Sequence, residues 1–511
     1  SVVLLCSGFA LYSFFRLSAA EGQKDFNLYE LVPSTTSAVF VTDDVLEFVA
    51  EVDELTCSKN QQYLYVSKLF SYLKQSLYAL SEDTPHGLSR QMNQMLISFH
   101  EPDNERNQVL YCRLGNGDKE LVNRFVRKYI SSLYPPKTFI YKGEEIIIYP
   151  MADGDFLACY LTSDFMALSF QKKLIENVID AYKSGKSLAD DSTFTGIRAP
   201  KKSAAAATIY TRMQGMMGWT EFDMKMKDDF IYFSGITHDA DTCFAFINQL
   251  RQQQSVKGFP GEVLPSTAFY FSRQGITDWV SLLSYGNAQG QSVPARTSEV
   301  QNRDKEFSRY LMENAGQDLV ACLFQREDTL QDAAAVLSLS VADVTEAERM
   351  LRALVNAAPA DEGRRNPRIT FCYTVNKAYP IYRLPQTTLF EQLTSFAEPT
   401  LDVYAAFYGG RLLLAPDADA LAHYIRQLDK GEVLNGAMAY QTGMDHLSDS
   451  YHFMLMADFD HIFQQSENHV RFVPDFFLRN ADFFRHFTLF VQFACADGMV
   501  YPNIVLKYKS E

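Results

Sequence analysis

Two patterns of apolar residues recur along this chain. Apolar residues at every second position predict β-strands, and "KTFIYKGEEIIIYPM" (137–151) and "ITFCYTVNKAYPIYRL" (369–384) each predict a hairpin of two strands. Longer segments with apolar residues three and four positions apart predict amphipathic helices. Because most strands come in hairpins, the pattern predicts an α+β fold with mostly antiparallel sheets and packed helices.

The clearest helices lie in "FMALSFQKKLIENVIDAYKSG" (165–185) and "RLLLAPDADALAHYIRQLDKG" (411–431). Each segment predicts a strand, then a helix, then a glycine at the helix end that tolerates positive φ, Gly185 or Gly431. Asp417 is a predicted N-cap. The two helices share an apolar face with spacing i, i+3, i+4, i+7, formed by Ile175, Val178, Ile179 and Tyr182 in one and by Leu421, Tyr424, Ile425 and Leu428 in the other.

Other phrases also occur twice and in the same order. "LVPSTTSAVF" (31–40) resembles "VLPSTAFYFS" (263–272), and each leads into a predicted helix. "NQVLYCRLGN" resembles "QDLVACLFQR", which sets Cys112 opposite Cys322. Hairpins with turns at Asp228-Asp229 and Asp497-Gly498 close both series. The ordered matches predict two tandem, internally duplicated α+β domains, 29–255 and 256–511, joined at the Pro- and Gly-containing "SVKGFPGEV".

Length and composition fit this organisation. The 511 residues suffice for two to four domains, and 47% are hydrophobic, enough for sizeable cores. The formal net charge is −15. Nucleic-acid binding needs clustered Lys and Arg, so this balance argues against a nucleic-acid partner.

The first fifteen residues, "SVVLLCSGFALYSFF", carry no charge, and Arg16 ends the run. A membrane-spanning helix needs about 20 apolar residues. We interpret 1–24 as the remainder of an N-terminal membrane anchor with a juxtamembrane link, so that residues 1–15 would contact the inner membrane. The alternatives are a cleaved signal peptide with Ser18 and Ala20 before the cut, lipidation at Cys6, and a buried core helix.

Familiar catalytic and metal-binding motifs are missing from the sequence. Gly185-Lys186-Ser187 matches the end of a phosphate-binding loop, but the required earlier glycine is replaced by Asp180. No C-x-x-C, H-E-x-x-H or G-x-S-x-G occurs. Most of the eight cysteines lie in apolar runs and are expected to be small buried hydrophobic residues. We therefore assign no catalytic, cofactor-binding or metal-ligating residue, and no cofactor.

One uneven feature is histidine. Five of the nine histidines lie between His446 and His486, among several aspartates, and "ADFDHIF" resembles a run of metal ligands. The corresponding region of the first half, "TRMQGMMGW", has neither His nor carboxylate. We expect Asp458 to cap a short helix, and we expect no metal site in 445–486. The histidines and aspartates concerned are His446, His452, His461, His469, His486, Asp445, Asp449, Asp458 and Asp460.

The layout resembles a bacterial envelope family of unknown function, on the basis of "LVPSTTSAVFVTDD", "VLPSTAFYFS" and the N-terminal apolar run. Members of that family combine a short N-terminal anchor with duplicated α+β halves, and the family supplies no catalytic residues. The resemblance implies a single-pass protein of the bacterial inner membrane with its body in the periplasm.

Our leading hypothesis for function is a membrane-anchored, extracytoplasmic binding or scaffold protein without catalysis, whose partner is another envelope protein or lipid. Two alternatives stay open. One is a metal-assisted envelope hydrolase that uses the His and Asp cluster of the second half. The other is a carrier of lipid or lipoprotein, suggested by the 14% aromatic content.

Overall fold

The computed structural model forms two compact units, Ser1–Val52 with Tyr65–Gln214 and Asp53–Leu64 with Gly215–Glu511. It describes residues 26–59, 92–100, 106–115, 118–125, 134–151, 154–198, 205–212, 218–237, 245–277, 279, 298–326, 333–358, 368–384, 403–465, 473 and 475–509. These residues include thirteen α-helices. Eight strands in the first unit and twelve in the second pair antiparallel. The mixed α+β class with antiparallel pairing is as predicted.

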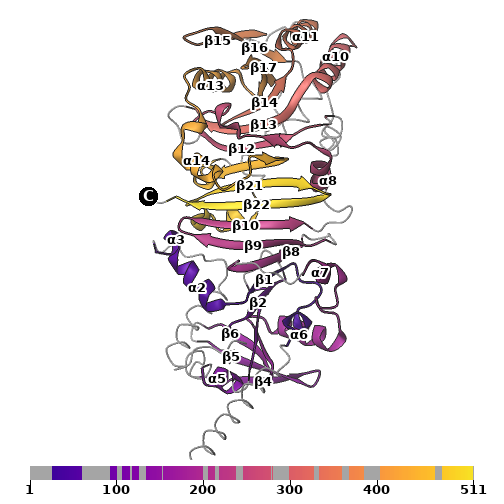
Figure 1. Cartoon of the computed structure of the whole chain (residues 1–511), viewed down its shortest axis with the longest axis vertical. Coiled ribbons are helices and arrows are strands. Elements are labelled where there is room, and N and C mark those ends of the chain that lie inside the picture. Colours follow the sequence, from indigo (N-terminus) through magenta and orange to yellow (C-terminus); the bar gives the residue numbers. More distant parts are fainter. Residues whose placement is uncertain are drawn as a thin grey trace, which may run out of the picture. The chain divides into compact units, whose positions relative to one another are not determined.

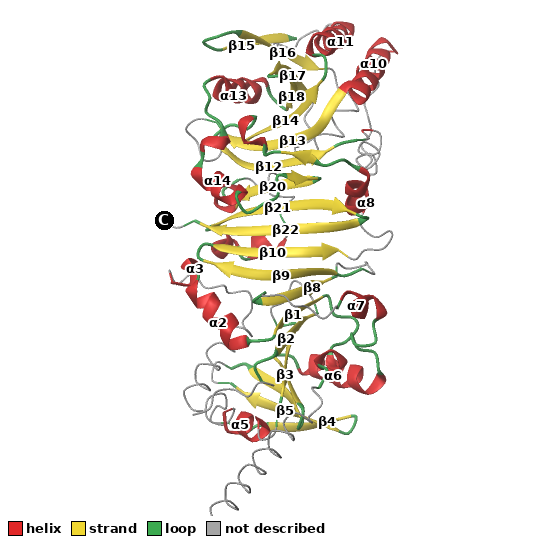
Figure 2. Cartoon of the chain, in the orientation of Figure 1, coloured by secondary structure: helices red, strands yellow, loops and turns green. Residues whose placement is uncertain are grey.

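In the first unit the strands pair in the order β8-β1-β2-β3-β7-β6-β5-β4. Figure 2 shows helices α6 and α7 on one side of these strands and α2 on the other. The elements are η1 (Leu28–Leu31), β1 (Ala38–Thr42), α2 (Val45–Glu54), β2 (Met95–Phe99), β3 (Gln108–Arg113), α5 (Asp118–Phe125), β4 (Lys137–Tyr141), β5 (Glu144–Pro150), β6 (Phe156–Leu161), β7 (Phe165–Ser169), α6 (Lys172–Ser184), α7 (Ser192–Ile197) and β8 (Ala207–Thr211).

In the second unit the order is β9-β10-β22-β21-β20-β12-β13-β14-β18-β17-β16-β15. The strands are β9 (Thr220–Lys227), β10 (Phe230–Thr237), β12 (Ala268–Gly275), β13 (Ala315–Gln325), β14 (Ala333–Val341), β15 (Ile369–Tyr373), β16 (Ala378–Leu384), β17 (Val403–Tyr408), β18 (Arg411–Ala415), β20 (Phe453–Asp458), β21 (Phe487–Ala496) and β22 (Met499–Tyr508), besides a small ladder of β11 (Val256–Lys257) with β19 (Ser450–Tyr451).

The helices of the second unit cover both faces of its sheet, with α13 and α14 along one side and α10 and α11 along the other (Figure 1). Strand β14 shows why, because adjacent residues of a strand point to opposite faces. Val336 belongs to the core that includes α13 and α14, and its neighbour Leu337 belongs to the core that includes α10 and α11. The helical elements are α3 (Thr56–Lys59), α8 (Ala245–Gln252), η3 (Pro260–Glu262), α10 (Ser298–Asn314), α11 (Val344–Ala357), α13 (Ala418–Asp429), η4 (Leu434–Gly436), α14 (Met438–Met444), α15 (Phe459–Phe463), α17 (Asp475–Arg479) and α18 (Ala481–Phe484).

The same strand order occurs in both halves of the sequence. The order β8-β1-β2-β3-β7-β6-β5-β4 has its counterpart in β20-β12-β13-β14-β18-β17-β16-β15. The two Pro-Ser-Thr phrases also make equivalent bridges, Pro33 with Ser187 and Pro265 with Val433. Each phrase therefore fastens the start of its half to the loop after α6 or α13.

One of the predicted correspondences is wrong. Cys112 lies on β3, which pairs with β2 and β7, whereas Cys322 lies on β13, which pairs with β12 and β14. The true counterpart of β3 is β14, and that of β13 is β2. These central strands are almost entirely buried, so their similar apolar composition does not distinguish one from the next.

The two predicted helix ends are confirmed. Gly185 and Gly431 have φ of 62° and 76°, in the left-handed region that favours glycine. Asp417 caps α13 by accepting a hydrogen bond from the Ala420 amide at 2.7 Å. In α6 the predicted face is buried at Ile175, Val178 and Ile179. The Gly185-Lys186-Ser187 motif is thus a helix end.

The compact units divide between Gln214 and Gly215, whereas the sequence repeat changes near 255–263. Strands β9 and β10 belong to the second unit because β10 pairs with the last strand, β22, from Phe230 opposite Lys507 to Thr237 opposite Val500. The hairpin that ends the first half of the sequence therefore extends the sheet of the second unit.

No helix among the described residues is long and apolar enough to cross a membrane. The predicted anchor at residues 1–24 lies outside the described part of the chain.

Candidate ligand-binding pocket

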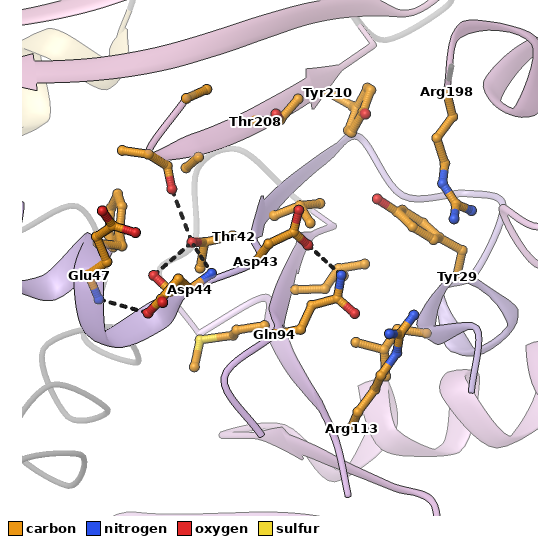
Figure 3. A pocket seen from close by; sticks show the side chains of 18 of the residues that line it. Tyr29, Thr42, Asp43, Asp44, Glu47, Gln94, Arg113, Arg198, Thr208 and Tyr210 are labelled. Atoms are coloured by element: carbon orange, nitrogen blue, oxygen red, sulfur yellow. Dashed lines mark hydrogen bonds between the residues drawn. The ribbon is translucent and has the colours of Figure 1, made fainter. Parts of the chain in front are cut away.

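A cavity of about 590 Å³ lies within the first unit, where β1 ends and where β2 and β8 begin. Its size is within the range typical of small-molecule sites. Figure 3 shows charged side chains of opposite sign on its two sides. The polar residues that line it are Tyr29, Thr42, Asp43, Asp44, Glu47, Glu51, Gln94, Arg113, Arg198, Thr208 and Tyr210.

The acidic side is built by the link from β1 into α2. Asp44 accepts a hydrogen bond from the Glu47 amide at 2.9 Å, and so satisfies one free amide of the first helical turn. Asp43 accepts a hydrogen bond from the Gln94 side chain, at the start of β2. The Thr42 hydroxyl donates to the Ala206 carbonyl at 3.0 Å. These bonds hold the carboxylates at the edge of the cavity, beside the helix N-terminus that favours negative charge.

The basic side is built around Tyr29 on η1. The Arg198 guanidinium lies over the Tyr29 ring, with Cζ 4.1 Å from the ring centroid, and the Phe194 ring lies 5.2 Å from it. Arg113, the last residue of β3, donates through Nε to the Phe26 carbonyl at 2.6 Å. Tyr29 is thereby held in one position by an arginine and an aromatic ring.

The Tyr29 hydroxyl faces the cavity between these two sides (Figure 3). Tyr29 is only 8% exposed, and its hydroxyl makes no hydrogen bond with any described residue. Burial raises the pKa of this phenol far above its usual range, Tyr210 and Asp43 add to the increase, and Arg198 and Arg113 oppose it. The hydroxyl stays neutral at physiological pH and can both donate and accept a hydrogen bond.

The strand registers locate the same position in the second half. Val41 pairs with Leu96 and Thr208, and Arg273 pairs with Val320 and Met454. Val41 follows Pro33 by eight residues and Arg273 follows Pro265 by eight, so Arg273 stands where the first half has Val41. Continuing along the same ladders, the counterpart of Gln94 is Asp318, that of Asp43 is Gly275, and that of Ala205 is Tyr451.

In the second half this position holds a cluster of ion pairs. Asp318, 8% exposed, lies 2.8 Å from Arg273 Nε and 3.1 Å from Arg411 Nη1. Arg273 also donates to the Gly258 carbonyl at 2.7 Å and to the Tyr451 hydroxyl at 3.1 Å. The side chains of Arg273 and Tyr451 occupy space that Val41 and Ala205 leave free in the first half.

Backbone closes the second-half position further. A Cβ atom at Gly275 would lie 2.0 Å from the Gln254 carbonyl oxygen, so no side chain fits there. The equivalent residue in the first half, Asp43, carries a side chain that borders the cavity. The same fold thus holds an open polar pocket in its first half and a site filled by its own ion pairs in its second.

The histidine-rich region does not form a comparable site. His446 lies 3.2 Å from the Tyr232 hydroxyl, and the His452 ring accepts from the Cys495 amide at 3.1 Å. His461 Nδ1 lies 3.2 Å from the Asp458 carboxylate, which raises the pKa of His461 by acting as an acceptor for the protonated ring. His486 packs near Tyr508, and His469 lies outside the described residues.

Asp458 caps α15 through the Asp460 amide, as predicted. Within the described ranges, no three His, Cys, Asp or Glu side chains are close enough together to hold a metal ion. The structure therefore lends no support to the metal-assisted hydrolase.

The cysteines that the structure describes are free thiols, and five of these six are buried. Burial raises the pKa of Cys112 and of Cys159 to about 12, so neither thiol ionises at neutral pH. This agrees with the prediction that they are small buried hydrophobic residues.

Sequence reasoning missed every polar residue of the pocket. The lining comes from separate segments, and Tyr29, Asp43, Gln94, Arg113 and Arg198 form no motif. One available signal was a difference between the repeats, since the small Ala205 of the first half corresponds to the large Tyr451 of the second. The mistaken strand match concealed the other differences.

No family model, curated protein or solved structure matches this chain.

Proposed function

We propose that this chain is a non-catalytic binding protein of the bacterial cell envelope, and that the pocket of its first half holds a small polar ligand. Residues 1–15 anchor it in the inner membrane, and the body lies in the periplasm. The two halves, 29–255 and 256–511, arose by duplication, which accounts for their shared strand order. Only the first half kept an open site.

One observation carries the binding function. The position that Arg273, Asp318 and Tyr451 fill in the second half is an open cavity in the first, with the unpartnered Tyr29 hydroxyl facing into it. A ligand that enters this cavity can supply the hydrogen-bond partner that the protein does not give this hydroxyl. The charged lining does not suit an acyl chain, which argues against the lipid carrier.

Filling the pocket tests this function. We expect Ala205→Tyr, which imports the residue of the second half, to abolish ligand binding while the chain stays folded. A panel of small polar metabolites is screened by thermal unfolding of the full chain, because a ligand at 100 times its Kd stabilises the folded state by about 2.7 kcal/mol. At least one metabolite should raise the Tm of the wild type and leave that of A205Y unchanged.

Ala378→Tyr is the matched control, because Ala378 is an exposed strand residue of the second unit. It should respond to the ligand as the wild type does. A ligand that stabilises A205Y as strongly as the wild type would show that it binds elsewhere and overturn the assignment of the pocket.

The proposed location has its own test. Protease added to intact cells should leave the chain whole, and protease added after the outer membrane is opened should digest the body. The reason is that a single apolar segment carries the chain across the inner membrane once. Digestion that begins only when the inner membrane is also broken would place the body in the cytoplasm and contradict the proposal.

A further inference from the structure

We propose that the ligand is a free amino acid or short peptide with a basic side chain, bound through its α-ammonium group, its carboxylate and its side chain at once. This inference rests on the proposed binding function and specifies the chemical class of the ligand. It follows from the signs, positions and pairing of the charges around the Tyr29 hydroxyl.

Asp43, Glu47 and Arg198 line the pocket with charges of both signs and are not paired with each other. Asp43 bonds to the neutral Gln94 side chain, and Arg198 lies over the Tyr29 ring. Within the described ranges, neither of them, nor Glu47, makes an ion pair. Opposite charges that could neutralise each other are instead held on opposite sides of a cavity (Figure 3). A ligand that carries both charges would complete both pairs.

The second half shows what a completed site looks like in this fold. There Asp318 lies between Arg273 and Arg411, so the protein itself supplies both the anion and its cations. In the first half the corresponding residues, Gln94, Val41 and Phe165, carry no charge. The ligand in the first half takes the role that this internal cluster has in the second.

The separation of the charges sets the orientation of the ligand. Its carboxylate is placed against Arg198, which can donate two parallel hydrogen bonds. Its ammonium group is placed against Asp43. The Tyr29 hydroxyl lies between the two and can donate to the carboxylate or accept from the ammonium group.

The balance of charge favours a basic side chain. Three of the lining carboxylates, Asp43, Asp44 and Glu47, face the single guanidinium group of Arg198 across the pocket. After one ammonium group and one carboxylate are matched, negative charge remains in excess near the start of α2. The cavity of about 590 Å³ also leaves room beyond a bare α-amino acid head group.

The test matches deletions in the protein with deletions in the probe. L-arginine, agmatine, which lacks the carboxylate, and Nα-acetyl-L-arginine, which lacks the α-ammonium charge, are titrated calorimetrically into the full chain. We expect L-arginine, or the dipeptide Lys-Ala, to bind at least about tenfold more tightly than agmatine or the acetylated compound, because each deletion removes a charge-assisted hydrogen bond. L-glutamate should not bind.

The variants assign each group to its partner. Arg198→Gln should weaken L-arginine about tenfold and leave agmatine unchanged. Asp43→Asn should weaken L-arginine similarly and leave Nα-acetyl-L-arginine unchanged. Tyr29→Phe should weaken L-arginine about tenfold or more, the effect of one hydrogen bond to a charged group. The Tm of each unliganded variant shows that it is folded.

The outcomes separate this inference from the proposed function. If A205Y blocks a different metabolite while L-arginine and Lys-Ala do not bind, the pocket is a binding site and the ligand class is wrong. If agmatine binds as tightly as L-arginine, the carboxylate contact is wrong. If A205Y blocks no ligand at all, the proposed function fails together with this inference.

Discussion

Replacing Asp318 with alanine should destabilise the second unit by about 3–5 kcal/mol, measured as the free energy of unfolding in urea. Asp318 accepts from Arg273 and Arg411, and all three side chains are at most 15% exposed. Removing the anion would leave two buried guanidinium groups without a counter-charge. Such a penalty is much larger than the value of the ion pair itself, because desolvation offsets most of the attraction.

The first half supplies a matched control. The triple variant Asp318→Gln, Arg273→Val, Arg411→Phe installs the residues that stand at these positions in the first half, namely Gln94, Val41 and Phe165. Replacing a whole buried ionic cluster by neutral side chains is often close to neutral, so this variant should recover most of the lost stability. A D318A protein within 1 kcal/mol of the wild type would mean that water reaches the arginines and that the cluster does not close the site.

Gly275→Ala is the second change with a large expected effect, a loss of about 3 kcal/mol in the free energy of unfolding of the second unit. The new Cβ atom would lie 2.0 Å from the Gln254 carbonyl oxygen, which belongs to backbone and cannot rotate away. The Gly275 amide also donates to the His452 carbonyl at 2.9 Å, so a shift of β12 would weaken that bond. Urea unfolding measures the loss.

Gly436→Ala is the comparison for this prediction, since a Cβ atom there would meet nothing within 4 Å. It should change the free energy of unfolding by less than about 0.5 kcal/mol. If G275A and G436A proved equally harmless, the segment around Gln254 would have to lie farther from β12 than the structure places it, and the second-half site would be open like the first.

Taken together, the two halves show one fold used in two ways. A cavity lies where β1 ends and β2 begins. The equivalent position in the second half, at the end of β12, is filled by Arg273, Tyr451 and backbone atoms. Both arrangements place an arginine against a backbone carbonyl at the same point, Arg113 on Phe26 and Arg273 on Gly258. What differs is the strand that supplies the arginine, which is β3 in the first half and β12 in the second.

Local sequence was enough for several elements. The hairpins at 137–151 and 369–384 form as β4–β5 and β15–β16, because alternation of apolar and polar residues is a property of neighbours in the chain. The helices α6 and α13 likewise follow from 3.6-residue periodicity, and their ends from Gly185 and Gly431.

Strand partners were harder to assign. The segments Met95–Phe99 and Ala333–Val341 were not predicted as strands. Without them, Cys112 was wrongly matched with Cys322. Buried central strands are apolar on both faces, so nothing in their composition names a partner. Their order follows from pairing over long sequence separations, such as β3 with β7 and β14 with β18.

The sequence by itself determined the fold class, the repeated Pro-Ser-Thr start and the helices with their glycine ends, because these depend on residues a few positions apart. Only the tertiary structure decided where a binding site could exist. Tyr29, Asp43, Gln94, Arg113 and Arg198 meet because β8, β1, β2 and β3 lie side by side. Whether the site stays open depends on the volume of the side chains that converge there, small Val41 and Ala205 in one half and large Arg273 and Tyr451 in the other, and that sum is a property of packing in three dimensions.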